Sequence, residues 1–318
     1  MRPDASPPAV ADTPPSRRAR VAAAAAVAVA AGVYAGLCLA TRGVASDFEV
    51  WWHAARLLAR GVDPYALGPN AAGWPFDGWL FYPLPALLLT LPVAPLPMPV
   101  AGAVLLGAAA GALAWGLTAD GWWRLWLLAS PAFVMALKLG QWSPLLTAAA
   151  LLPALGACAA AKPTLGLAAL AYRADRRAAA AAGVVLAASV LVLPAWPREW
   201  LANLGHVAGH PAPALTWAGA PLVLALLRWR RPEARLLAAM ACVPQLLFFA
   251  DQLAIGLVAR SAREAKLLSA CGMAAWGLWL ATVDPRAPYV PAAAPWVLAG
   301  VYLPALALVL RRPNARGA

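Results

Sequence analysis

The chain has 318 residues, of which 63% are hydrophobic and 12% are charged, and its mean hydropathy is +0.69. This composition excludes an ordinary soluble domain and predicts a protein that crosses a membrane several times. The formal net charge is +12, but the basic residues fall in short clusters between apolar runs, so membrane topology explains them better than nucleic-acid binding does.

The apolar runs divide the chain into predicted spanning helices. Residues 1–20 are rich in Pro, Ala and Arg and predict a disordered tail, and the run at 21–40 predicts a first helix that is retained rather than cleaved. Further spans are predicted at 82–97, 99–118, 123–139, 178–194, 212–227, 267–283 and 289–310. We therefore expect one transmembrane domain at 21–312 and a short tail at 313–318.

Two segments interrupt this simple pattern. Lys162 and Pro163 break the apolar run between Gly140 and Arg173, and residues 235–260 fit two short helices that enter the membrane and return. Unwound backbone at membrane depth is tolerated only where protein covers it or where it lines a wet cavity. The sequence therefore predicts an all-α, polytopic membrane bundle of about nine to eleven segments, with broken or re-entrant helices around an internal polar cavity.

Basic clusters predict the orientation of the chain. They occupy 17–20, 173–177, 228–235, 260–266 and 311–316. Because cytoplasmic loops carry the excess of Lys and Arg, we expect both termini inside and the polar loop at 41–81 outside. High Ala and Arg usage suggests a bacterial protein, and the expected location is the cytoplasmic membrane.

The outer loop begins with a predicted amphipathic helix at 47–60. Apolar side chains including Phe48, Trp51 and Trp52 fall on one side, and polar ones including Glu49 and His53 fall on the other. Such a segment is typical of the membrane interface. Two interpretations of Asp47 are open, since its carboxylate can cap the helix or serve in an active site.

A few polar residues are candidates for chemistry. Lys162 is one of three lysines and lies deep in an apolar run, where an ammonium is costly unless it pairs or reaches the interface. Asp251 follows an apolar stretch and either serves a cavity or caps a short helix. His53 either tunes a proton transfer or is merely solvated. His206 and His210 have the spacing to share a metal, but no third ligand is evident, and the four cysteines are far apart; we expect no metal site.

The order of several short motifs resembles the GT-C membrane glycosyltransferases, most closely glycosyltransferase family 87. The matching pieces are Asp47-Phe48, residues 54–65, Phe81 to Pro85 with Leu91-Pro92, Leu139-Gly140-Gln141, and Lys162-Pro163. They cover roughly residues 20–180. The chain departs from the family pattern at Leu84 and Ser143, where the family has Pro and Asn.

This resemblance implies a hexosyltransferase that carries a sugar, mannose in the family, from a polyprenyl-phosphate donor to a hydroxyl of a glycan or glycolipid acceptor. It implies inversion, with Asp47 as the general base and Glu49 and His53 as possible supporting residues. Residues expected around the donor phosphate and the cavity are Tyr82, Gln141, Lys162, Gln245 and Asp251. No cofactor is required, and a need for divalent metal is left open.

Two other functions remain open at this point. A transporter or flippase of polyprenyl-linked glycans also needs broken helices and a polar cavity, and it places its essential charges at Lys162 and Asp251. A non-catalytic membrane protein of the same fold is the third possibility. The enzyme differs from both in requiring Asp47.

Overall fold

The computed structural model describes residues 15–41, 46–206, 210–284, 286 and 289–314. Within these ranges the chain forms helices and no strands, which confirms the all-α class. The expected tail at 1–20 lies outside the described residues up to residue 14, and Arg17 to Arg20 already form the first turn of a helix. Of the expected C-terminal tail, residues 315–318 lie outside them as well.

The N-terminal half contains a pair of long helices and several short ones. In chain order these are α1 (Arg17–Thr41), α2 (Asp47–Ala59), η1 (Pro64–Ala66), α3 (Leu84–Thr90), η2 (Leu91–Val93), α4 (Met98–Leu117), η3 (Thr118–Asp120), η4 (Trp122–Ala129), α5 (Pro131–Leu139), α6 (Ser143–Leu151), η5 (Pro153–Ala161) and α7 (Pro163–Tyr172). Small residues let α1 and α4 approach closely, since a Cβ on Gly107 would lie 2.7 Å from the Ala28 carbonyl oxygen.

The C-terminal half continues the same alternation. Its elements are α8 (Arg176–Val192), α9 (Trp196–Leu204), η6 (Pro213–Leu215), η7 (Ala220–Arg228), α10 (Pro232–Cys242), η8 (Phe249–Asp251), η9 (Leu253–Val258), α11 (Ala262–Thr282), α12 (Tyr289–Val297), the π-helical turn η10 (Leu298–Tyr302) and α13 (Leu303–Arg311). Helices occur near the predicted spans at 21–40, 99–118, 178–194, 267–283 and 289–310. The predicted spans at 82–97 and 123–139 are each divided into shorter helical pieces, and 212–227 is made of 3₁₀ turns rather than one α-helix.

Three helices of the described chain are long and apolar enough to cross a membrane: Arg17–Thr41, Met98–Asp120 and Pro291–Arg311. A fourth is counted if α8 and α9, which meet at an angle of 101°, form one broken span. Many leucines and valines of α8 and η7 are exposed, and such surfaces favour a lipid environment. Several apolar helices thus support a membrane protein with at least three spanning candidates.

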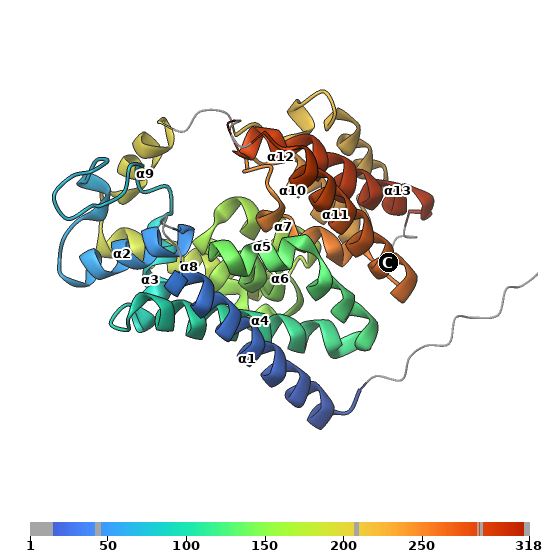
Figure 1. Cartoon of the computed structure of the whole chain (residues 1–318), viewed down its shortest axis with the longest axis horizontal. Helices are drawn as coiled ribbons and strands as arrows, with labels where there is room; N and C mark the ends of the chain where they lie inside the picture. The colour runs from blue at the N-terminus through green and yellow to red at the C-terminus, as the bar shows by residue number, and fades with distance from the viewer. Residues whose placement is uncertain (1–14, 42–45, 207–209, 285, 287–288, 315–318) are drawn as a thin grey trace, which may run out of the picture.

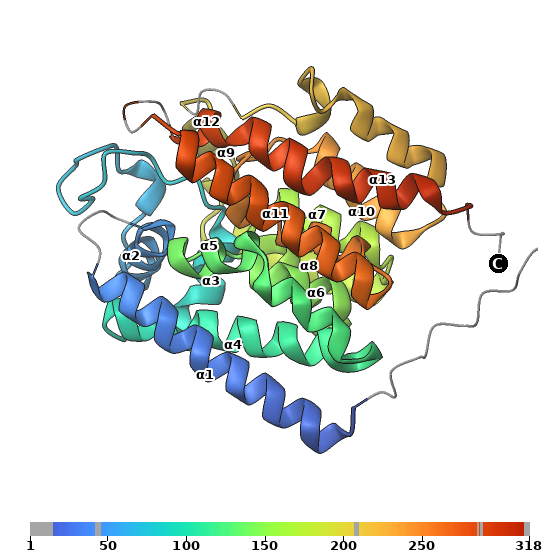
Figure 2. The ribbon, with the colours of Figure 1, turned by 45° about the vertical axis from the view of Figure 1, so that its right-hand side comes forward.

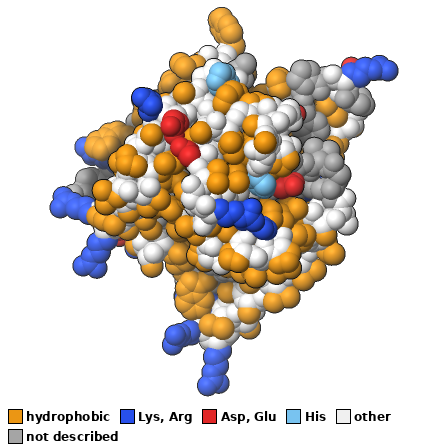
Figure 3. All heavy atoms as spheres, turned by 90° about the vertical axis from the view of Figure 1, so that its left-hand side faces the viewer, with side chains coloured by type: hydrophobic (Ala, Val, Ile, Leu, Met, Phe, Trp, Pro, Cys, Tyr) orange, Lys and Arg blue, Asp and Glu red, His pale blue; other side chains and the backbone are white. Residues whose placement is uncertain are grey.

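The two ends of the molecule differ in what they carry. Figures 1 and 2 show α2, α9 and the loop after α2 at one end, whereas the first turn of α1 and the end of α13 lie toward the other. Figure 3 views the first end, where hydrophobic side chains cover much of the surface and charged groups are scattered among them.

Candidate functional site

A cavity of about 470 Å³ lies beside α2 and collects most of the polar residues expected to be functional. Its wall is formed by Asp47, Phe81, Tyr82, Pro83, Gln141, Lys162, Pro163, Thr164, Trp200, Leu204, His210, Pro244, Gln245, Leu246 and Asp251. Six of the eight residues predicted for the site are on this wall, and they come from segments spread over 205 positions of the chain, from Asp47 to Asp251. The exceptions are Glu49 and His53.

Asp47 is placed by the first turn of α2. Ser46 is the N-cap, and its hydroxyl oxygen accepts a hydrogen bond from the Glu49 backbone N–H at 3.3 Å. The capping role therefore belongs to Ser46, whereas the Asp47 carboxylate accepts a hydrogen bond from the side-chain amide of Gln141 and lines the cavity. Glu49 lies in the same turn, where its negative charge complements the helix dipole.

The apolar side of α2 is turned toward protein. Phe48 and Trp51 are fully buried, and the Trp51 ring lies 4.7 Å from the ring of Trp142. We expected this face to meet the membrane interface, but the amphipathic pattern reports only that one side avoids water. The neighbouring helices supply the apolar surface instead.

His53 serves the outer loop rather than the cavity. Its Nε2 lies 2.8 Å from the Gly73 carbonyl oxygen, and its ring packs edge-on against Trp74 and Phe76. The side chain is therefore neither simply solvated nor directed at Asp47. These contacts of His53 hold the loop after α2 against this helix.

The turn between α5 and α6 places Gln141 against α2. Gly140 ends α5 in the left-handed region at φ 70°, and a Cβ there would lie 2.3 Å from Cβ of Phe48. Glycine is therefore needed both for the backbone angle and for the close approach. The Gln141 backbone N–H donates to the Ala136 carbonyl at 2.8 Å, which closes the turn.

Lys162 and Asp251 form an ion pair on the cavity wall. The Lys162 Nζ lies 2.7 Å from both carboxylate oxygens of Asp251 and 3.2 Å from Oε1 of Gln141. The Asp251 side chain is 2% exposed and that of Lys162 is 21% exposed. Lys162 is the residue that separates η5 from α7, and Asp251 ends η8, so both lie at breaks in helical structure.

A second layer of polar residues holds the segment that carries Asp251. The Ser143 hydroxyl donates to the Ala250 carbonyl at 2.6 Å, and the side-chain amide of Gln245 donates to the Met240 carbonyl. The Gln252 amide nitrogen bonds Gln245, while its oxygen accepts from the Tyr302 hydroxyl at 2.7 Å. Sequence reasoning missed Tyr302, which lies 51 positions after Asp251 and near no recognisable motif.

Helix α9 covers one side of the cavity. Trp200 lines it and donates its indole N–H to the Phe81 carbonyl at 2.9 Å, and Asn203 donates to the Leu80 carbonyl at 3.4 Å. The ring of His206 stacks on Trp79, with centroids 4.6 Å apart, so its observed partner is aromatic. No group of three or more metal-ligating side chains occurs among the described residues.

Two carboxyl groups meet where α9 rests on the outer loop. Burial raises the pKa of Glu199 above its ordinary value of 4.5, and the nearby Asp63 carboxyl raises it further, while Arg198 opposes the shift. Asp63 also accepts from the Tyr65 backbone N–H at 2.9 Å and so caps the 3₁₀ turn η1. The contact between α9 and the outer loop therefore depends on the protonation state of Glu199.

Comparisons with family models, curated proteins and solved structures find no match for this chain. The resemblance to the GT-C glycosyltransferases therefore stays a prediction.

Proposed function

We propose that this chain is a membrane glycosyltransferase that moves a sugar from a polyprenyl-phosphate donor to an acceptor hydroxyl. The observation that carries the proposal is the meeting of Asp47, Gln141, Lys162 and Asp251 on one cavity wall. A carboxylate and an ammonium, held apart by an amide, are the groups that such a transfer requires.

In the proposed reaction, Asp47 accepts the proton of the acceptor hydroxyl while that oxygen bonds the anomeric carbon. The bond from this carbon to the phosphate oxygen breaks, and polyprenyl phosphate leaves with the electron pair. Attack from the opposite side inverts the anomeric centre. Lys162 lies on the cavity wall, where its ammonium can stabilise the leaving phosphate. The ion pair with Asp251 holds this ammonium in place.

The proposal includes a membrane arrangement finer than the three or four spanning candidates. Short and broken helices such as α5–α6 and η5–α7 would bring the total to about nine to eleven membrane segments. The chain would lie in a bacterial cytoplasmic membrane with the cavity opening outward and both termini inside. A reporter that is active only in the cytoplasm, fused after Ala318, should be active, and an inactive fusion would refute this orientation.

The direct test is transfer from labelled polyprenyl-phosphate mannose to lipid and glycan acceptors in membranes that contain the protein. Loss of the general base in Asp47→Asn should lower transfer at least about 100-fold, because a positioned base contributes 10²–10⁴. Asp77→Asn is the matched control, since Asp77 is an exposed carboxylate of the same loop that does not line the cavity. Equal activity of Asp47→Asn and Asp77→Asn would refute the proposed mechanism.

The buried Lys162–Asp251 pair also favours a second candidate, a transporter of polyprenyl-linked glycans, because charges inside membranes often mark transport pathways. Reconstituted vesicles with a fluorescent lipid-linked sugar distinguish the two functions. A transporter would move the label across the bilayer, tolerate Asp47→Asn and fail when Lys162 is replaced by Met. The enzyme would form a glycosylated product and would fail in Asp47→Asn.

A further inference from the structure

Gln141 joins the carboxylate and the ammonium of the site through the two ends of one amide. Its Nε2 donates to Oδ2 of Asp47, and its Oε1 accepts from Nζ of Lys162 at 3.2 Å. The side chain is 3% exposed. A carboxylate at this position would repel Asp47, and an apolar side chain would leave both neighbours without this partner, so the amide fits both contacts at once.

The backbone holds Gln141 in this place without help from a ligand. The turn at Gly140 packs directly on Phe48, the residue next to Asp47, and the Gln141 N–H is bonded to the Ala136 carbonyl. The distance between the two backbones is therefore set by packing. Only the side-chain amide of Gln141 needs to be ordered for it to reach the carboxylate.

We propose that Gln141 is a positioning residue that holds the Asp47 carboxylate in its ionised form and in a fixed orientation for proton abstraction. This inference rests on the proposed function, since it names the residue through which the base is held. An N–H donated to a carboxylate oxygen restrains its rotation and favours the anion over the acid. The coupling to Lys162 orients the amide, so that its nitrogen rather than its oxygen faces Asp47.

Other titratable groups face the same space and belong to the electrostatics of Asp47. Those on the cavity wall are Tyr82, Lys162, His210 and Asp251, and Glu49 lies on the same helix. The Tyr82 phenol also contacts the Gln141 side chain. Asp251 compensates the charge of Lys162, and the hydrogen bond from Gln141 is a direct contact to the Asp47 carboxylate.

The first test compares the wild type with Gln141→Leu and Gln141→Glu in the transfer assay over a range of pH. Removal of the N–H donor, or its replacement by a carboxylate, disfavours the anion, so the acidic limb of the rate profile should move to higher pH, by about one unit in Gln141→Glu. The kcat should fall on the order of 10–100-fold. A merely structural role would lower the rate at every pH and leave the limb in place.

A second readout does not depend on transferase activity. A hydrophobic carbodiimide modifies protonated carboxyl groups, and peptide mass spectrometry measures the fraction of Asp47 that is modified at each pH. The midpoint of modification should rise in both Gln141 variants, and it should stay at the wild-type value in Gln245→Leu, whose glutamine lines the cavity but bonds the Met240 carbonyl. If Gln141→Leu elutes as an aggregate, Gln141→Met provides the same comparison, because it also lacks the N–H donor and adds no charge.

These two readouts separate the possible failures. If the wild type transfers no sugar but the modification midpoint moves, the proposed function fails while the role of Gln141 toward Asp47 stands. If transfer occurs and neither the limb nor the midpoint moves, the inference about Gln141 is wrong and the proposed function survives.

Discussion

At the scale of single residues, the site contains a row of three charged groups and one amide joined by hydrogen bonds. Hydrogen bonds link Asp47 to Gln141, Gln141 to Lys162 and Lys162 to Asp251, so a carboxylate lies at each end. A single ammonium cannot neutralise two carboxylates. When all of these groups are ionised, the four site residues together carry one net negative charge. In the proposed reaction, the donor phosphate would share Lys162 with Asp251, so the energy of this pair would affect both stability and binding.

The Lys162–Asp251 pair gives the first prediction at this scale. Asp251→Asn leaves the ammonium without its counter-ion and should destabilise the protein by about 2–4 kcal/mol, a value reduced because Lys162 is partly exposed. Lys162→Met should destabilise it as well, since Asp251 is then a buried unpaired charge. The melting temperature in detergent, followed by tryptophan fluorescence, measures both effects.

The double variant Lys162→Met with Asp251→Leu serves as the control, because it removes both charges together. Replacement of a buried pair by apolar groups is often neutral, so the double variant should be more stable than either single variant. Equal melting temperatures for the wild type and both single variants would show that the pair does not contribute to stability.

At the scale of elements, three of the candidate site residues lie at interruptions of helices. Gln141 follows the end of α5, Lys162 lies between η5 and α7, and Asp251 belongs to the short turn η8. Backbone groups released at such breaks need other partners, and the Ser143 hydroxyl and the Gln252 amide satisfy several of them. The breaks and the polar cavity are therefore parts of one arrangement.

Helix α9 gives a prediction about pH. The folded pKa of Glu199 lies above its unfolded value, so the stability it contributes is complete below the unfolded pKa and is lost as pH rises through the folded pKa. We therefore expect the backbone amides of α9 to exchange faster at pH values above the folded pKa of Glu199 than at pH values below its unfolded pKa, after correction for the intrinsic chemical rate. Hydrogen–deuterium exchange of peptides covering 196–204 measures the effect.

The variant Glu199→Gln tests the cause of this pH dependence. It removes the ionisable group while retaining most of the side-chain volume, so protection of α9 should become independent of pH over the same range. Peptides from α4, which lacks ionisable side chains, provide the internal reference. An unchanged pH dependence in Glu199→Gln would assign the effect to another group.

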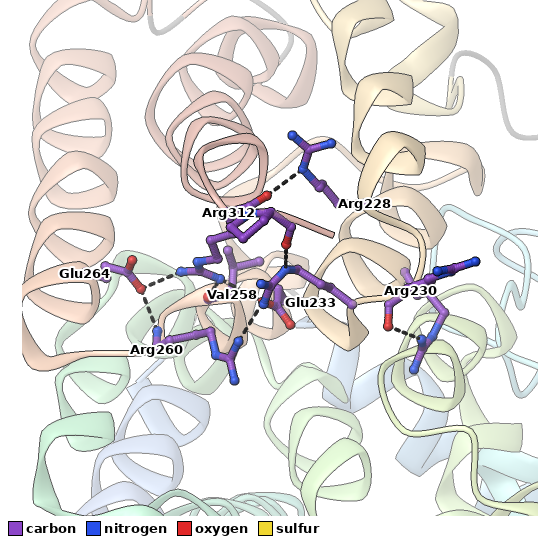
Figure 4. A network of polar contacts seen from close by, with 10 residues as sticks. Arg228, Arg230, Glu233, Val258, Arg260, Glu264 and Arg312 are labelled. Carbon is purple, nitrogen blue, oxygen red and sulfur yellow. Dashed lines mark hydrogen bonds and ion pairs between the residues drawn. The ribbon is translucent and has the colours of Figure 1, made fainter. Parts of the chain in front are cut away.

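At the scale of the whole molecule, three of the five basic clusters meet in one network at the end of α13 (Figure 4). Arg312 contacts Glu233 at 3.0 Å and also pairs with Glu264, and its backbone carbonyl accepts from the Arg228 side chain. Arg260 lies 3.7 Å from the same Glu233. This convergence supports the expectation that these clusters share one side of a membrane.

The network predicts a strong difference between two adjacent arginines. Arg312→Ala leaves the buried Glu233 with weaker partners and should lower stability by about 2–3 kcal/mol. Arg311→Ala is the matched control, because Arg311 is exposed and forms no ion pair with the residues that the structure describes, so its replacement should change stability by less than about 0.5 kcal/mol. Thermal unfolding of both variants in the same detergent makes the comparison, and similar melting temperatures would contradict it.

The two interrupted segments show how far sequence alone reaches. Lys162-Pro163 and the polar groups at 244–252 were recognisable because proline and charge disturb an apolar run within a few residues, which is a local signal. The amphipathic face of α2 was recognisable for the same reason. The periodicity did not show whether this face contacts lipid or neighbouring helices, because an amphipathic pattern indicates only that one side of the helix avoids water.

The amino-acid sequence was enough to predict the helical class, several apolar helices that suit a membrane, and the interruptions at Lys162-Pro163 and 244–252. It did not predict the breaks within 82–97 and 123–139. Only the tertiary structure decided that Asp47 meets Gln141 across 94 positions and that Lys162 meets Asp251 across 89. It likewise directed His53 to Gly73 and left the cap of α2 to Ser46. Hydropathy and helix propensity act between near neighbours in the chain, whereas these contacts depend on how distant helices pack.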